Sequence, residues 1–213
     1  MRMMPKPTSA TPRLLAALTL ALAAAAPARA APLELTQASI PQLEKAMSDG
    51  SLTSEQLVGL YLKRIEAYDK QGPKINAVIT LNPNALAEAK ELDAERKAGK
   101  IRGPLHGVPF TAKDSFDTAG VVSTGGTLGR KSYVPGKDAS VVDRVRKAGG
   151  ILLGKTNTPE FTLGGAARET YNLLFGQTYN PYNNAYLCSG SSGGAGAIVA
   201  AGGAFFDLGS DYG

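Results

Sequence analysis

Short apolar segments with strand composition alternate with helix-like segments along most of this chain. The strand candidates are residues 75–81, 108–112, 151–153 and 204–208. Strands that alternate with helices predict an α/β domain whose sheet is at least partly parallel. Functional side chains gather at strand ends in such a domain, so the residues that follow these segments are the first candidates for a site.

Two helices are predicted before the first strand. Ser39 and Pro41 begin one that ends near residue 50, and Thr53 forms a capping box with Gln56 at the start of the next. The second helix carries a helically spaced stripe that we expect to pack in the core: Leu57, Leu60, Tyr61, Ile65 and Tyr68.

Three further helices are predicted between and after the strands. Asn82 and Pro83 begin a charged helix that runs to about residue 99, and Asp138 caps a helix over residues 139–148. Residues 193–201 suit a helix of small residues packed closely against its neighbours. The segment 170–186, rich in Asn, Tyr and Pro, is predicted to be a long loop.

The net charge of +5 comes mostly from the first thirty residues, which carry four basic and no acidic side chains. The rest of the chain has 19 basic and 18 acidic residues, a net charge of +1 that gives no support to nucleic-acid binding.

The basic start, the apolar run 14–26 and the small-residue site 28–30 predict a signal peptide over residues 1–30. We therefore expect an exported protein, periplasmic or secreted, with one domain over residues 31–213. The apolar run is shorter than the roughly 20 residues of a bilayer span, so no membrane anchor is predicted.

The chain has one cysteine, Cys188, and one histidine, His106. A single cysteine makes no disulfide within the chain, so the fold must depend on its hydrophobic core. One thiol and one imidazole do not complete the usual zinc ligand sets, and we predict no structural metal. We interpret Cys188 as a packed thiol and His106 as a structural residue at the entry of a strand.

Residues 149–156, with the sequence Gly-Gly-Ile-Leu-Leu-Gly-Lys-Thr, satisfy the phosphate-loop pattern. A phosphate loop needs flexible backbone between a strand and a helix. Here the variable positions are strand-forming Ile-Leu-Leu, and Pro159 interrupts the helix that should follow. A non-catalytic nucleotide-binding or partner-binding α/β domain stays open as the alternative to an enzyme.

The run from Gly190 to Gly194 also satisfies Gly-x-Ser-x-Gly, the nucleophile elbow of the α/β-hydrolases. That triad needs a histidine after the serine, whereas His106 precedes it and no other histidine is present. An elbow would therefore need residues beyond Gly213.

Lys113 follows the apolar segment 108–112, where loss of water would lower its pKa toward the neutral base form. The glycines around Ser191 and Ser192 let the backbone turn sharply, approach a substrate closely and present N–H groups. A surface lysine and a flexible glycine-serine linker are the plain alternatives. Together, the two motifs would supply a base and hydroxyls for acyl transfer.

Taken in order, four stretches resemble the amidase signature family: residues 105–114, 149–161, 189–194 and 209–213. Their order and their spread from about residue 35 to the end make the resemblance specific, whereas each stretch alone would be weak. The resemblance implies one α/β/α layered fold around a large mixed sheet, incomplete in this chain.

The resemblance also implies a Ser-cisSer-Lys site. Lys113 matches the family's lysine and Ser191 its serine in a cis peptide bond. The supporting loop would consist of Gly190, Ser192, Gly193 and Gly194. A second loop, which would form the oxyanion hole or contact the substrate, would consist of Asp211, Tyr212 and Gly213. Ser189 and Cys188 depart from the family's usual residues, but only locally.

The implied reaction is hydrolysis of a small-molecule or peptide amide without a cofactor. Neutral Lys113 would accept a proton from Ser191, which relays one from an attacking serine. That serine would lie two residues beyond Gly213 in the family pattern, so we expect the 213-residue chain alone to be inactive and poorly stable. Fatty, peptide and aryl amides all stay open as substrates, while the signal peptide disfavours a transamidosome component.

Overall fold

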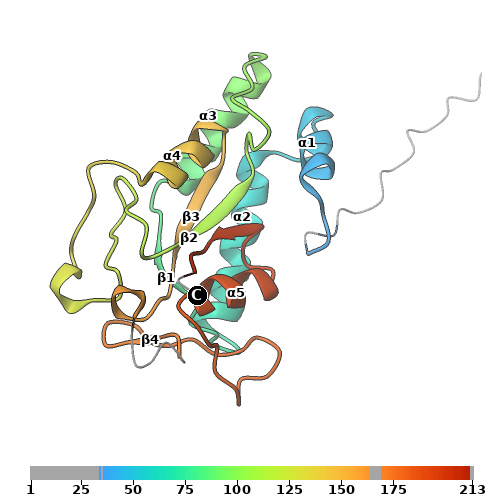
Figure 1. Cartoon of the computed structure of the whole chain (residues 1–213). Helices are drawn as coiled ribbons and strands as arrows, with labels where there is room; N and C mark the ends of the chain where they lie inside the picture. The colour runs from blue at the N-terminus through green and yellow to red at the C-terminus, as the bar shows by residue number, and fades with distance from the viewer. Residues whose placement is uncertain (1–33, 35, 164–168, 212–213) are drawn as a thin grey trace, which may run out of the picture. The chain divides into compact units, whose positions relative to one another are not determined.

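The computed structural model of the chain describes residues 34, 36–163 and 169–211 (Figure 1). In these ranges a four-stranded sheet has the order β1-β3-β2-β6. Its strands are β1 (Val78–Leu81), β2 (Pro109–Lys113), β3 (Ile151–Thr156) and β6 (Phe206–Leu208). β2 pairs in parallel with β3 and β6, and β1 pairs antiparallel with β3. The predicted α/β class with a mixed, partly parallel sheet is confirmed.

The strand bounds differ from the predicted ones where side chains compete for the backbone. β1 begins only at Val78, because Asn76 has a left-handed φ of 56° and the carboxylate of Asp69 accepts hydrogen bonds from the N–H groups of Ala77 and Val78. β2 extends one residue beyond the predicted segment, so Lys113 is its last residue.

The phosphate-loop pattern lies largely inside β3, which continues three residues past the predicted end and is buried throughout. Gly154, Lys155 and Thr156 are paired with residues of both β1 and β2. A Cβ atom on Gly154 would lie 2.4 Å from the carbonyl oxygen of Thr80, so glycine is needed here for strand packing. These residues form no phosphate-binding loop, which removes the observation that favoured a nucleotide-binding domain.

The two predicted starts of the first helices are confirmed. α1 (Ile40–Ser48) begins after Ser39 and α2 (Ser54–Arg64) after Thr53, each with a capping box. α2 continues directly into the π-helix η1 (Ile65–Lys70).

The predicted core stripe of α2 is partly wrong. Leu57, Tyr61 and Ile65 are buried, whereas Leu60 and Tyr68 are 45% and 43% exposed. The wider turns of the π-helix move the buried face past Tyr68 to Asp69. Leu60 lies at the edge of the stripe, in a surface groove that Leu52 and Leu86 also line.

The starts of the next two helices were also misplaced. α3 (Ala85–Lys97) begins after Asn84, because Asn82 uses its side-chain amide to donate to the carbonyl oxygen of Leu152 in β3. α4 (Ser140–Lys147) begins after Ala139, because the carboxylate of Asp138 accepts from the Ala119 N–H at 2.7 Å. The predicted helix of small residues is confirmed as α5 (Gly193–Ala200).

The predicted long loop after residue 170 contains a small sheet. β4 (Tyr171–Asn172) and β5 (Gly176–Gln177) pair antiparallel. Asn172 closes the turn between them, because its side-chain oxygen accepts from the N–H groups of Leu174 and Phe175. Two short 3₁₀ helices, η2 (Leu128–Arg130) and η3 (Glu160–Thr162), lie in the other loops.

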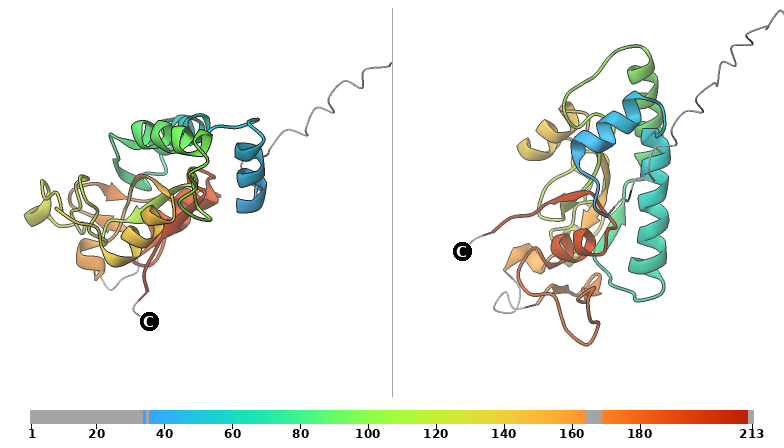
Figure 2. Two further views of the ribbon diagram at one scale, coloured as in Figure 1. Left: turned by 90° about the horizontal axis from the view of Figure 1, so that it is seen from above. Right: turned by 90° about the vertical axis from the view of Figure 1, so that its right-hand side faces the viewer.

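Successive residues of the central strands alternate between two hydrophobic clusters. Ile151 and Leu153 pack with α2, α3 and α5, whereas Leu152 packs with Phe110 and with Val142 of α4. Figures 1 and 2 show α4 on the opposite side of β2 and β3 from α2. Phe110 and Phe206 extend the second cluster by stacking at 5.5 Å between ring centroids.

The predicted signal peptide falls within residues 1–33, outside the described part of the chain. In the described part, no helix combines the length and the apolar character that a membrane span requires.

Candidate active site

Lys113 lies at the centre of a cluster of serines, at the end of β2. Its fully buried ammonium nitrogen donates to Ser191 Oγ at 2.7 Å and to Ser210 Oγ at 2.8 Å. The carbonyl oxygen of Ser210 accepts a third hydrogen bond at 3.3 Å. The alternative of a surface lysine is therefore wrong, and Lys113 and Ser191 lie in one cluster.

Burial lowers the pKa of Lys113 to about 8, against the smaller opposing effects of Asp207 and Asp211. The neutral form of Lys113 is therefore accessible near neutral pH. Neutral lysine has a free electron pair, and Ser191 Oγ is close enough to give it a proton. The predicted lowering of this pKa by the apolar strand is confirmed.

The glycines after Ser192 bring the start of α5 close to β3 and its neighbours. A Cβ atom on Gly194 would lie 2.5 Å from the backbone nitrogen and oxygen of Asn157, and one on Gly193 would lie 1.8 Å from Thr170 Oγ1. Gly190 has a φ of 79°, which a side chain would strain. These contacts contradict a flexible linker, because the loop's backbone is packed against the sheet.

Ser192 fixes the terminal loop to this cluster. Its Oγ donates to the carbonyl oxygen of Ser210 at 2.7 Å and accepts from the N–H of Ser210 at 3.1 Å. Ser210 is thereby held with its own hydroxyl toward Lys113. Ser210 belongs to the terminal motif, but it is not among the site residues predicted from the sequence. Its place between Gly209 and Asp211 of that motif is the sequence feature that could have identified it.

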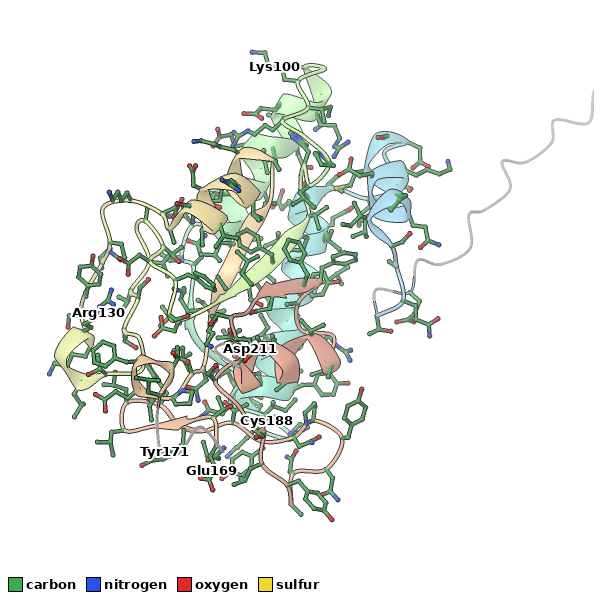
Figure 3. All side chains as sticks on the ribbon, viewed as in Figure 1. Lys100, Arg130, Glu169, Tyr171, Cys188 and Asp211 are labelled. Carbon is green, nitrogen blue, oxygen red and sulfur yellow. The ribbon has the colours of Figure 1, made fainter. Side chains whose placement is uncertain are left out.

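The remaining predicted residues of the terminal loop are described only in part. Asp211 is exposed, and its charge opposes the lowering of the Lys113 pKa (Figure 3). Tyr212 and Gly213 lie outside the described residues, so their predicted part in an oxyanion hole stays a prediction.

The predicted cis peptide bond before Ser191 does not agree with the structure, because the described parts of the chain contain no cis bond. A cis bond before a residue other than proline costs about 3–4 kcal/mol and needs neighbouring structure to enforce it. Ser191 reaches Lys113 at 2.7 Å without one.

His106 and Cys188 have structural surroundings. His106 is fully buried, with its Nε2 3.0 Å from the carbonyl oxygen of Leu92 and its Nδ1 accepting from the N–H of Arg102. Burial raises the pKa of the Cys188 thiol, which lies in the loop before α5 (Figure 3). Over the described ranges, no group of three or more His, Cys, Asp or Glu side chains is arranged to hold a metal ion.

The fold and the cluster define a class of protein. It is an α/β domain in which a lysine at a strand end is buried among serine hydroxyls. A sequence model of the family described as Amidase matches residues 56–213. The chain belongs to this family, the amidase signature family.

Similar proteins include several amide-processing enzymes. A glutamyl-tRNA(Gln) amidotransferase subunit from a Synechococcus strain is 40% identical over 176 residues, which are 82% of this chain and 35% of that protein. Indoleacetamide hydrolase from Bradyrhizobium diazoefficiens is 40% identical over 79% of this chain and 31% of its own length. The chain thus spans about a third of the length of these curated relatives.

The fold is likewise similar to solved structures. The native peptide amidase from Stenotrophomonas maltophilia matches with a TM-score of 0.77 and 40% identity, over 81% of this chain and 36% of that one. A fatty acid amide hydrolase matches with a TM-score of 0.75 and 28% identity, over 83% of this chain and 30% of that one.

Proposed function

We propose that the protein hydrolyses the C–N bond of a carboxamide through a serine acyl-enzyme, with Lys113 as the base. The observation that carries this proposal is the 2.7 Å hydrogen bond between the buried Lys113 nitrogen and Ser191 Oγ. Membership of the amidase signature family supports the reaction class. The names of the relatives span amidotransferase, indoleacetamide, peptide and fatty acid amide chemistry, so the acyl group is left open.

The proton moves in two stages. Neutral Lys113 accepts the hydroxyl proton of Ser191, and Ser191 accepts one from the attacking serine, which the family pattern puts beyond Gly213. The serine oxygen forms a bond to the amide carbon, and the C–N bond breaks as the proton returns through Ser191 to the leaving ammonia or amine. Water then attacks the acyl-enzyme by the same proton path and releases the acid.

The test is turnover of a small primary amide by the whole protein. Lys113→Ala is expected to lower kcat about 10²–10⁴-fold near neutral pH, because the base is lost. Lys147→Ala is the matched control, since Lys147 is exposed and pairs with Asp143 on the surface. Lys113→Ala activity close to that of the control would contradict the proposal.

The pH profile gives a second readout. A base must be neutral to act, and the pKa of Lys113 is about 8. We therefore expect kcat/KM to fall about tenfold per pH unit below pH 8 and to level off above it. A profile that is flat between pH 6 and 9 would exclude Lys113 as the base.

We also propose that the protein is exported, on the strength of residues 1–30 alone. Mass spectrometry of the protein from its native host should give an N-terminus near Ala31. Recovery of residues 1–30 from the mature protein would contradict export by this route.

A further inference from the structure

Asp207 lies on the strand beside Lys113, and the sequence did not single it out. In the parallel pairing of β6 with β2, Asp207 is opposite Thr111. In the pairing of β2 with β3, Thr156 is opposite Lys113. Residues that are paired across neighbouring strands point to the same face, and Thr111 and Lys113 share a face because they are two residues apart. Asp207, Thr111, Lys113 and Thr156 therefore belong to one face of the sheet.

A hydrogen bond aims the Asp207 carboxylate across β2. Thr156 Oγ1 donates to Asp207 Oδ2 at 3.0 Å, although β2 lies between the strands that carry the two residues. Asp207 starts at the level of Thr111, and Thr156 is at the level of Lys113. The hydrogen bond thus runs diagonally over β2 and brings the carboxylate to the side of the Lys113 side chain.

Among the described residues, the other charges to consider near Lys113 come from the terminal loop and from β3. Asp211 of the terminal loop acts on Lys113 in the same direction as Asp207, and α5 carries no titratable side chain. Lys155 of β3 points to the other face, because it is paired with Ala112, yet its charge lowers the pKa of Asp207 more than that of Lys113 does, and Asp207 in turn raises the pKa of Lys155. Asp207 is therefore the carboxylate that the sheet itself holds beside Lys113.

We propose that Asp207 is a positioning residue for Lys113, whose carboxylate, aimed by Thr156, stabilises the protonated lysine and so sets the pH at which Lys113 becomes a base. The role as a base rests on the proposed function, whereas the coupling of the two charges does not. Protonated Lys113 is the state that holds the proton until the leaving amine takes it. A fixed negative charge beside it stabilises that state, as a carboxylate does for a catalytic imidazole.

The coupling has a definite sign and pH range. Burial raises the pKa of Asp207 to about 6, and Lys113 has a pKa of about 8, so both are charged between these values. Removing the charge of Asp207 should lower the pKa of Lys113 and shift the acid limb of kcat/KM to lower pH. Below about pH 6 Asp207 is already neutral, so the variant and the native protein should converge there.

The experiment measures Lys113 ionisation directly, in the whole protein labelled with ¹³C-lysine. The Cε resonance of Lys113 is assigned by its loss in Lys113→Met and then titrated by NMR. Asp207→Asn should lower the pKa of Lys113 by about one unit, as expected for loss of a nearby opposite charge. Thr156→Val should give a smaller shift in the same direction, and Asp207→Glu should restore most of the native value. Asp143→Asn, which removes a surface carboxylate that pairs with Lys147, should leave it unchanged.

The outcomes for this inference and for the proposed function are separable. An unchanged Lys113 titration in Asp207→Asn overturns the inference, whatever the turnover. A shift in the Lys113 titration together with an equal shift in the acid limb of the kcat/KM profile supports the inference. If the titration shifts but the acid limb of kcat/KM does not, the part of the inference that concerns catalysis is overturned. Full turnover by Lys113→Ala overturns the proposed function instead. If Asp207→Asn fails to fold by circular dichroism, Thr156→Val carries the test, and its failure to move the titration overturns the inference.

Discussion

Two lysines are buried in neighbouring strands of one sheet, and they differ in the groups around their ammonium nitrogens. Lys113 ends β2 and Lys155 is in β3, on the opposite face. Burial lowers the pKa of each to about 8. Lys113 donates to serine hydroxyls and a carbonyl oxygen. Lys155 is 3.6 Å from the buried carboxylate of Asp114 and donates to Ser123 and to the carbonyl oxygen of Phe116.

The difference shows that the partners of a buried lysine, rather than its burial, decide whether it suits proton transfer. In the described residues, the groups that accept hydrogen bonds from Lys113 are neutral, so loss of its proton leaves no hydrogen-bonded carboxylate without a cation. Loss of one from Lys155 would leave the Asp114 carboxylate, whose own pKa burial raises, without its cation. Lys155 thus has the surroundings of a structural ion-pair partner, while Lys113 has no carboxylate among its hydrogen-bond partners in the described residues and is coupled only through space to Asp207 and Asp211.

The largest expected effect tests the structural lysine. Lys155→Met should lower the free energy of unfolding at pH 7 by about 3–5 kcal/mol, because it leaves Asp114 buried and unpaired with a cation. Denaturant unfolding of the whole protein measures the change. Lys147→Met, at an exposed pair with Asp143, is the control and should change stability by less than about 0.5 kcal/mol. A Lys155→Met variant as stable as the control would mean that the two lysines do not differ as described.

The second effect should have the opposite sign. Lys113→Met should raise the free energy of unfolding at pH 7 by about 1–3 kcal/mol, because a lowered pKa means that charging the buried lysine costs stability. That cost is absent above the unfolded pKa of 10.5, grows as the pH falls from 10.5 to about 8, and is constant at lower pH. The gain should therefore be larger in unfolding measured at pH 7 than at pH 10. Destabilisation at pH 7 would show that the serine hydrogen bonds outweigh the cost of the charge.

Local pattern was enough to predict most of the elements, and the family resemblance added the pairing of Lys113 with Ser191. Ser39 and Pro41 located the start of α1, the capping box of Thr53 and Gln56 located α2, and the apolar segment before Lys113 predicted both β2 and the burial of the lysine. The starts of α3 and α4 were missed for one reason. Asn82 and Asp138 suit a helix cap locally, yet each makes a hydrogen bond to a distant segment instead.

The rest of the cluster depends on strand pairing, which a single sequence does not reveal. Asp207 is beside Lys113 only because β6 pairs with β2 in one particular register. Ser210 reaches Lys113 only because Ser192 holds its backbone. The residues that the sequence did single out, Lys113 and Ser191, were recognisable from motifs, whereas these two were recognisable only from contacts between motifs.

The smallest expected effect concerns the two serines whose hydroxyl groups accept hydrogen bonds from these lysines. Lys113 donates to Ser191 Oγ at 2.7 Å, and Lys155 donates to Ser123 Oγ at 3.1 Å. Removing either hydroxyl by substitution with alanine should lower the free energy of unfolding by about 1 kcal/mol, the value of one hydrogen bond. The proposed proton path passes through Ser191 but not through Ser123, so Ser123→Ala should keep its turnover within about twofold of the native protein. A large loss of turnover in Ser123→Ala, with no more than the expected loss of stability, would connect Lys155 to the reaction and remove the distinction between the two lysines.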